Sequence, residues 1–227
     1  MDDLAVDDGV SCGILQIGDG VAPEDGHIGI FAHAANGGIK TDPNAFTGVP
    51  GLFAAGEVTG GMHGADRIGG LSTANGLVFG GKAGRSAAEA CAGTPEPPDE
   101  YLFHAASSGN VPEVLSTLQE AMFRNAMVIR GEEGLSAALG TVERLSANLS
   151  LCPSADVRAI AQTRRLTGRL HTAEAILKAA LLRRESRGAH YRADYPEADP
   201  AQSSPIIVSQ DSGAIRARFT KEDVPCS

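Results

Sequence analysis

The chain has 227 residues, 42% of them hydrophobic, and 19 Lys and Arg against 28 Asp and Glu give it a formal net charge of −9. This acidic balance argues against nucleic acid and anionic membranes as main partners, because both bind basic surfaces. No apolar run approaches the ~20 residues that span a bilayer, and the acidic start MDDLAVDDG is unlike a signal peptide. We therefore expect a cytoplasmic protein, peripheral to a membrane only through partners.

The four cysteines are scattered singly, so neither a metal site nor a disulfide scaffold is expected. Glycine is the compositional anomaly. The chain has 28 glycines, about 12% where ~7% is usual, and most of them precede residue 95. This uneven distribution predicts two unlike parts, the first rich in turns and the second rich in helices.

In the glycine-rich part, residues 51–57 (GLFAAGE) predict a short buried strand that ends in a glycine turn. The loop 59–70 follows, and its glycines allow positive φ and a close approach of the backbone to a ligand. From Ser72 to about Ala92 the pattern is helical, with Ser72 as the expected N-cap. Four glycines would weaken this helix and so predict close packing against a flat group or another backbone: Gly76, Gly80, Gly81 and Gly84.

The stretch 93–100 is rich in Pro and Glu and must be irregular, so we place a module boundary there. Three amphipathic helices follow: one begins near Val111, one spans 132–149, and one spans 155–185 with Ser154 as a candidate N-cap. Their short connections predict a small antiparallel bundle.

The period of the pattern changes again near the carboxyl end. Apolar residues 205–209 and 214–219 flank a Gln-Asp-Ser-Gly sequence, which predicts a β-hairpin.

Four motifs carry the chemistry: HAANGGI at 33–39, VPGLFAAGE at 49–57, HGADRIGGLS at 63–72 and ESRGAHYRADYP at 185–196. In order and spacing they resemble the flavoprotein subunits of succinate dehydrogenase and fumarate reductase, and the related L-aspartate oxidase. Any one motif would be a weak signal, whereas four in family order are specific. The resemblance covers only the carboxyl-terminal part of such a flavoprotein.

With this resemblance, the elements above predict an α+β fold in three parts. Residues 1–95 are expected to be the carboxyl-terminal portion of an FAD-binding α/β module that also holds the substrate site. Residues 96–200 are expected to form the antiparallel three-helix bundle, and residues 201–227 the hairpin tail.

The resemblance implies FAD as the cofactor and Glu57 as a residue that binds it. A carboxylate after a glycine turn can accept hydrogen bonds from ribose or ribityl hydroxyls, although a surface Glu after a turn has the same sequence pattern. Ser72 and Thr73 are candidates for the polar edge of the flavin, because helix N-terminal amides favour negative charge. Three glycines are assigned to cofactor-facing loops: Gly38, Gly56 and Gly70.

The resemblance also implies that His33 and Arg67 are the catalytic residues and hold a small dicarboxylate beside the flavin. An arginine matches the two oxygens of a carboxylate and stays charged, which suits it to polarise the substrate. His63 lies in the same loop as Arg67 and is interpreted as structural or substrate-side. Two interpretations stay open for Arg187 and His190: charge that complements a helix C-terminus, or a direct place in the site.

Several family features are changed or missing. Ala34 replaces an aromatic residue, Asp66 replaces the usual Asn and adds a negative charge beside Arg67, and Leu71 removes a polar group near the expected flavin. The Gly-x-Gly-x-x-Gly fingerprint that holds the FAD pyrophosphate is missing, as are the capping domain and its proton-delivering arginine. We therefore expect half a site, completed by a chain or segment that carries the N-terminal FAD-binding half.

Two other functions stay open at this stage. The chain could be a catalytically inactive interaction or assembly module derived from such a flavoprotein. It could also be an L-aspartate oxidase-like fragment, because the residues that choose the substrate lie partly in the missing capping domain.

Overall fold

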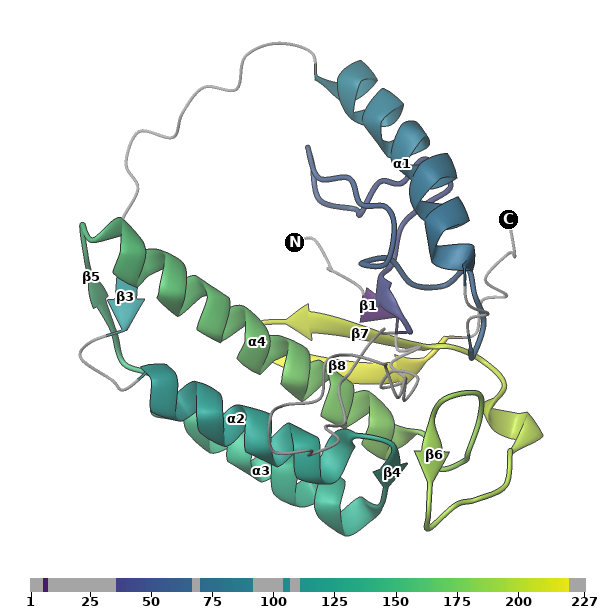
Figure 1. Ribbon diagram of the computed structural model, residues 1–227, viewed down its shortest axis with the longest axis vertical. Helices are drawn as coiled ribbons and strands as arrows, with labels where there is room; N and C mark the ends of the chain where they lie inside the picture. The colour runs from purple at the N-terminus through teal and green to yellow at the C-terminus, as the bar shows by residue number, and fades with distance from the viewer. Residues whose placement is uncertain (1–5, 8–35, 67–69, 92–103, 107–110, 221–227) are drawn as a thin grey trace, which may run out of the picture.

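The computed structural model describes residues 6–7, 36–66, 70–91, 104–106 and 111–220. In Figure 1 a helical bundle and a small sheet occupy the lower part of the molecule. The glycine-rich segment and one further helix, α1 (Leu71–Ala90), stand above the sheet. The first, second and third motifs lie in this upper part, and the fourth motif lies at the end of the bundle.

Helices α2 (Val111–Ala126), α3 (Glu132–Ala147) and α4 (Val157–Leu182) confirm the predicted bundle. Helix α3 runs antiparallel to both of its neighbours (Figure 1). The apolar positions that recur at helical spacing face one another and form the core: Leu118, Ala126, Leu135, Ala138, Val142, Leu166, Leu170, Ala173, Leu177 and Ala180. Burial of these faces, more than helix propensity, holds such a bundle together.

The start of α4 differs from the prediction. Its N-cap is Asp156, whose carboxylate accepts hydrogen bonds from the backbone N–H groups of Arg158 at 2.9 Å and Ala159 at 3.2 Å. The Ser154 hydroxyl instead accepts from the backbone N–H of Asp156 at 3.1 Å. The assignment of Ser154 as the N-cap was therefore wrong; Asp caps helices as well as Ser does.

Strands β7 (Ile206–Asp211) and β8 (Ala214–Phe219) confirm the predicted hairpin. Ser212 and Gly213 form its two-residue turn with φ of 50° and 86°, as a type I′ turn requires. Ile206, Val208 and Ile215 pack against small residues of α4, namely Ala175 and Ala179.

The hairpin is also part of a larger sheet, which the sequence did not predict. The strand order is β2-β1-β7-β8, with β1 (Val6–Asp7) and β2 (Gly38–Ile39) contributed by the amino-terminal part of the chain. Strand β2 is the end of the first motif. The sheet therefore ties the first motif to the strands that α4 covers.

Two short strand pairs and a 3₁₀ turn complete the fold. Strand β3 (His104–Ala106) pairs antiparallel with β5 (Leu151–Pro153), and β4 (Ile129–Arg130) pairs parallel with β6 (Tyr191–Arg192). The 3₁₀ turn spans Pro200–Gln202. The β4–β6 pair brings the fourth motif to the loop between α2 and α3.

Helix α1 lies within two residues of its predicted range, but its first turn differs. Gly70 is the N-cap, with φ of 89°, and no side chain caps the helix, so the assignment of Ser72 as the N-cap was wrong. The expected buried strand at 51–57 was also wrong: it is reduced to a single antiparallel bridge between Phe46 and Phe53, and Leu52 is 43% exposed.

The glycines of α1 do not make the close contacts that the sequence predicted, as far as the described residues go. A Cβ placed at Gly76, Gly80, Gly81 or Gly84 would meet no described atom within 4 Å. Within the same part of the chain, neither α1 nor any other helix is long and apolar enough to cross a membrane.

Candidate functional site

The first motif and the residues that directly follow the second motif are joined by a close backbone approach at Gly38. The Ile39 N–H donates to the Val58 carbonyl at 2.8 Å, and the Gly60 N–H donates to the Ile39 carbonyl at 3.1 Å. Gly38 has φ of 150°, and a Cβ there would collide with the Val58 carbonyl group. Glycine is therefore required at this position for the two segments to lie side by side.

The first and third motifs are joined by a side-chain hydrogen bond. The Asn36 amide donates to a carboxylate oxygen of Asp66 at 3.2 Å. Asn36 lies three residues after His33, and Asp66 directly precedes Arg67. This contact brings together the two segments that carry the predicted catalytic residues, and it gives the unusual Asp66 a structural partner.

The third motif also contacts the first turn of α1. The Asn75 amide lies 3.2 Å from Nε2 of His63, and Asn75 is the one buried residue among those described on α1. Its Oδ1 atom is buried without a hydrogen-bond partner in the described residues. The side-chain amide can face the imidazole with its oxygen or its nitrogen. In both orientations one buried polar atom of Asn75 is left for another group.

The fourth motif reaches the third through Gly188. This residue has φ of +57°, and a Cβ there would collide with the Ala65 carbonyl group. The Ala189 N–H lies 3.4 Å from the same carbonyl oxygen. The first and fourth motifs, which are far apart in the sequence, thus both contact the loop that precedes Arg67, and the segment that follows the second motif contacts the first motif at Gly38.

The remaining predicted residues fall in three places. His33 and Arg67 lie outside the described residues. Glu57 is exposed at the turn beside Gly56, and Thr73 is exposed on the first turn of α1. Ser72, on the same turn, is half-buried, and Gly70 caps the helix.

Three glycines of the predicted cofactor and substrate loops leave open space beside the backbone. Gly56, Gly64 and Gly70 all have positive φ, and a Cβ at any of them would meet no described atom within 4 Å. Gly70 is the N-cap of α1, no side chain caps this helix, and the Thr73 N–H donates to the Gly70 carbonyl at 3.1 Å. A helix N-terminus without a side-chain cap suits the polar edge of a flavin.

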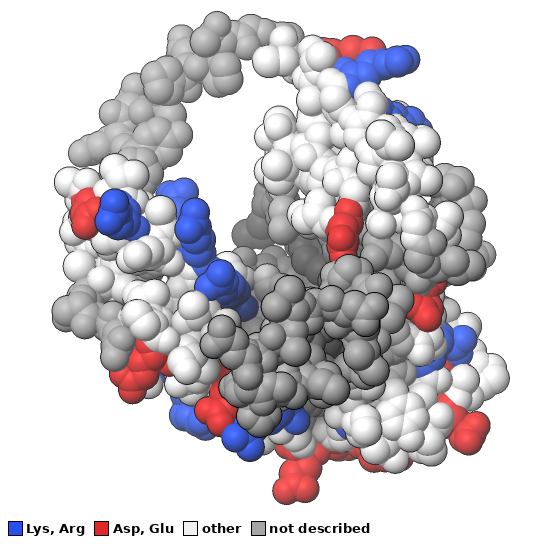
Figure 2. Space-filling model, in the orientation of Figure 1, with Lys and Arg blue, Asp and Glu red and all other residues white. Residues whose placement is uncertain are grey.

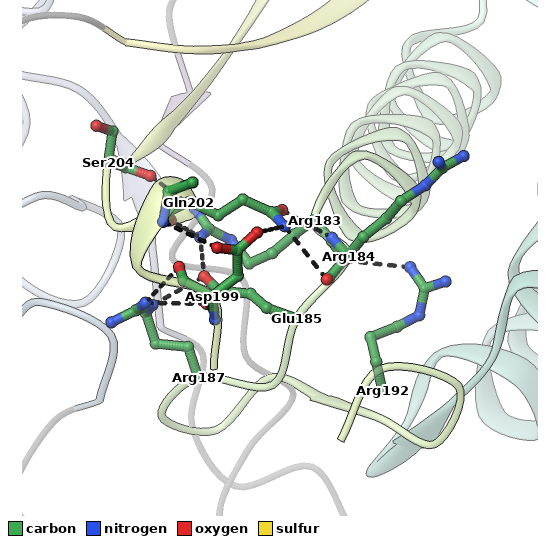
Figure 3. Close-up of polar contacts among 9 residues, drawn as sticks. Arg183, Arg184, Glu185, Arg187, Arg192, Asp199, Gln202 and Ser204 are labelled. Atoms are coloured by element: carbon green, nitrogen blue, oxygen red, sulfur yellow. Dashed lines mark hydrogen bonds and ion pairs between the residues drawn. The ribbon is translucent and has the colours of Figure 1, made fainter. Parts of the chain in front are cut away.

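The fourth motif forms a buried ionic network at the end of α4 (Figure 3). Glu185 is fully buried and accepts hydrogen bonds from Arg183 at 2.7 Å and from Arg187 at 2.8 and 2.9 Å. The backbone N–H of Asp199 donates to the same carboxylate at 2.7 Å. Burial raises the pKa of Glu185, but these four donors outweigh it and hold the pKa below its usual value.

Arg192 anchors the same network to the bundle. It is fully buried, and its guanidinium binds both oxygens of Asp194 at 2.7 Å and the Ala180 carbonyl at 2.8 Å. Asp194 in turn accepts from the backbone N–H of Glu132 at 2.9 Å, at the start of α3. The hydrogen bonds from Arg192 hold the pKa of Asp194 well below its usual range.

His190 closes the network on the other side. Its Nδ1 lies 2.7 Å from a guanidinium nitrogen of Arg130, which is itself 2% exposed. Because Arg130 can only donate, Nδ1 is the acceptor and the imidazole is neutral. Burial and the charge of Arg130 lower the pKa of His190 to about 4. Arg187 and His190 are therefore held inside this network, and neither of the two interpretations left open by the sequence describes them fully.

This geometry predicts a pH dependence of stability. The pKa of His190 is lowered in the folded protein, so the unfolded chain binds a proton first and stability falls as the pH drops below 6.5 toward 4. We expect this residue alone to reduce the free energy of unfolding by about 2 kcal/mol between roughly pH 7.5 and 5. The measurement is urea unfolding at both pH values for the wild type and for His190→Gln.

The variant should lose most of this pH dependence, since glutamine does not titrate. An unchanged pH dependence in His190→Gln would show that another group is responsible. The carboxylates of Glu185, Asp194 and Asp199 have lowered pKa values, so they lose their stabilising effect only at more acidic pH.

The sequence did not indicate four residues whose side chains hold this region together: Asn36, Asn75, Arg130 and Glu185. Asn75 carried one usable signal, because it is the only amide in an otherwise small and apolar stretch of α1. Arg130 carried none, since its partner His190 lies 60 residues away in the sequence. The described residues contain no cluster of three or more His, Cys, Asp or Glu side chains that could hold a metal ion.

Comparison with known protein families gives two matches. Residues 115–225 match a family model described as the carboxyl-terminal part of fumarate reductase flavoproteins. Residues 18–73 match a model described as an FAD-binding domain. The second match ends at Thr73, in the first turn of α1.

Among curated proteins, the chain is 30% identical over 210 residues to one subunit of the CoM/CoB fumarate reductase of Methanothermobacter marburgensis, covering 86% of this chain and 38% of that protein. It is 39% identical over 196 residues to L-aspartate oxidase of Mycobacterium tuberculosis, covering 81% of this chain and 34% of that protein. The chain thus spans little more than a third of the length of either.

Among solved structures, it resembles a mutant of FrdA of Escherichia coli quinol fumarate reductase with a TM-score of 0.72 and 27% identity, over 92% of this chain and 40% of that chain. It also resembles the Sdh1 complex of Mycobacterium smegmatis with a TM-score of 0.65 and 32% identity, over 83% of this chain and 35% of that chain.

Proposed function

Because the chain belongs to the succinate dehydrogenase and fumarate reductase flavoprotein family, we propose that it supplies the substrate-side half of an FAD-dependent oxidoreductase acting on a small dicarboxylate. The observation that carries the proposal is the set of contacts between the motif segments. Asn36 contacts Asp66, Gly38 lies against Val58, and Gly188 lies against Ala65. A structural remnant has no need to keep these segments together around open glycine backbone.

In this proposal Glu57, Ser72 and Thr73 contact FAD, together with the backbone at Gly38, Gly56 and Gly70. When bound, the flavin accepts or supplies a hydride. The uncapped N-terminus of α1 places amide donors and the positive end of a helix dipole in this region, which favours an electron-rich ring edge. Asn75, which is buried on the same helix, has one amide atom left for a further polar contact.

The proposed substrate residues come from the first and third motifs. Arg67 is proposed to bind a carboxylate of the substrate through two parallel hydrogen bonds, and His33 to bind beside it. His63 is proposed to line the substrate side, oriented by Asn75 at 3.2 Å. The cation polarises the carbon–carbon bond next to the carboxylate and so lowers the barrier for hydride movement.

A second segment is proposed to complete the site. The amino-terminal half of α1 carries no charged residue, and Leu77 and Val78 are 75% and 64% exposed. Figure 2 shows this helix as a mostly uncharged surface. An exposed apolar face of this kind marks an interaction surface, and the proposed partner is the amino-terminal FAD-binding half that the family resemblance implies. We propose that the assembled enzyme lies in the cytoplasm and that any association with the membrane is through its partners.

A related substrate is supported by a different observation. The L-aspartate oxidases are 37–39% identical to this chain, whereas the fumarate reductase relative is 30% identical. L-aspartate and succinate are both four-carbon dicarboxylates, so the same His33 and Arg67 would serve either. L-aspartate oxidation is therefore the second candidate activity.

The experiment is to produce the chain together with an amino-terminal FAD-binding segment of a family member. Bound flavin and turnover of succinate, fumarate and L-aspartate are then measured. Flavin-dependent turnover of one of these substrates supports the proposal and identifies the substrate. A complex that assembles without flavin and without turnover would instead support an inactive assembly module.

A further inference from the structure

We propose that the turn at residues 187–190 is a positioning device for the loop at residues 61–66, which leads in the sequence to Arg67. Gly188 is its contact residue and Glu185 its anchor. The inference rests on the proposed function, because it assumes that Arg67 binds the substrate. It assigns a role to the fourth motif, for which the sequence left two interpretations open.

The contact itself is unusually close. Gly188 has φ of +57° and lies so near the Ala65 carbonyl group that any Cβ would collide with its oxygen and carbon atoms. Gly38 shows a comparable collision with backbone, at Val58, the residue that directly follows the second motif. At both positions a glycine lets two segments that are distant in the sequence touch.

The turn is rigid because both of its ends are held. Arg187 and His190 exchange backbone hydrogen bonds of 2.8 and 3.0 Å across it. The Arg187 guanidinium binds the buried Glu185 carboxylate and the Asp199 carbonyl at 3.1 Å. The His190 imidazole binds Arg130 at 2.7 Å. The surface that meets Ala65 is therefore fixed by the buried network at the end of α4.

The loop is held by contacts from three different segments. His63 contacts Asn75 and Asp66 contacts Asn36. Ala65, between them, lies against Gly188 and receives the N–H of Ala189. Three nearly consecutive residues are thereby fixed, and Arg67 is the next residue but one after Ala65. The helical bundle in this way helps to hold the loop that leads in the sequence to the proposed substrate residue.

The test compares Gly188→Ala with Gly213→Ala in the full 227-residue chain. Both glycines have positive φ, but a Cβ at Gly213 meets no described atom within 4 Å, so the control carries the backbone strain without the collision. We expect hydrogen–deuterium exchange of peptides covering residues 60–66 to be about tenfold faster in Gly188→Ala and unchanged in Gly213→Ala. Exchange at the wild-type rate in a folded Gly188→Ala protein would overturn the inference.

Arg187→Lys is a second variant, for use if Gly188→Ala does not fold. Lysine keeps the charge but cannot form the two-fold contact with Glu185, so we expect a smaller acceleration, about threefold, in the same peptides. An unchanged exchange rate in folded Arg187→Lys would then count against the inference.

In the assembled enzyme, Gly188→Ala should raise KM for the dicarboxylate about tenfold while the flavin content stays at the wild-type level. A fall in kcat alone would contradict a role in positioning Arg67. Wild-type enzyme without turnover would refute the proposed function, yet the exchange experiment would still decide whether the turn positions the loop.

Discussion

Replacing Glu185 by glutamine is expected to reduce the free energy of unfolding by about 3–5 kcal/mol, because it removes the counter-charge of Arg183, which is buried, and of Arg187, which is partly buried. Glu185 is 0% exposed and receives three hydrogen bonds from Arg183 and Arg187 and one from the backbone of Asp199. Glutamine keeps the volume, so the loss reports charge and hydrogen bonding rather than a cavity. Urea denaturation at neutral pH measures the effect.

The matched control is Glu120→Gln. Glu120 also pairs with an arginine, Arg124, at 2.9 Å, but the two side chains are 62% and 71% exposed. We expect a loss of about 0.5 kcal/mol or less there. Similar small losses in both variants would show that the network around Glu185 is not the anchor that the structure indicates.

Replacing Arg67 by alanine in the assembled enzyme is expected to lower kcat/KM about 10²–10³-fold. The variant loses the group proposed to bind and polarise the substrate carboxylate, whereas the flavin contacts assigned to Glu57, Ser72 and Thr73 are untouched. Flavin content should therefore stay at the wild-type level. Steady-state kinetics with the preferred dicarboxylate and the flavin absorbance of the same sample provide the two measurements.

Arg67→Lys separates charge from geometry. Lysine retains the positive charge but lacks the planar fork that matches a carboxylate, so we expect an intermediate rate. Activity at the wild-type level in Arg67→Ala would show that the assignment of the catalytic arginine is wrong.

The spacing of apolar residues along the sequence predicted the three bundle helices and the two hairpin strands. Val111, Leu118 and Met122 recur at helical spacing, and the same period marks α3 and α4, because one face of each helix is buried. The hairpin followed from two apolar runs and a turn whose Ser212 and Gly213 adopt positive φ. These features depend on neighbouring residues, so a single sequence contains enough information to find them.

Contacts between distant segments could not be predicted in the same way. The expected strand at 51–57 is a single bridge, since Phe53 pairs only with Phe46. The sheet that joins β1 and β2 to the hairpin, and the Arg130–His190 contact, link residues far apart along the chain. Helix caps were ambiguous for another reason: Ser154 and Asp156 are both good caps, and only the structure selects Asp156.

For the candidate site, the sequence identified the motifs but not how they meet. Gly38 was assigned to a cofactor loop, and the structure shows in addition that it lets two distant segments touch. The contact between Gly188 and Ala65 was not predicted, because nothing in the sequence indicates that these two residues meet. For Arg187 the sequence allowed two interpretations, a charge that complements a helix end or a residue of the site. In the structure its guanidinium donates two hydrogen bonds to Glu185.

The central claim is that this chain supplies half of a flavin and dicarboxylate site, and one measurement tests it most directly. The chain is purified alone and together with an amino-terminal FAD-binding segment of a family member, and bound flavin is quantified from the visible absorbance spectrum. We predict a colourless chain when it is alone and one bound FAD per complex when both halves are present. Tight, stoichiometric FAD in the isolated chain would contradict the claim.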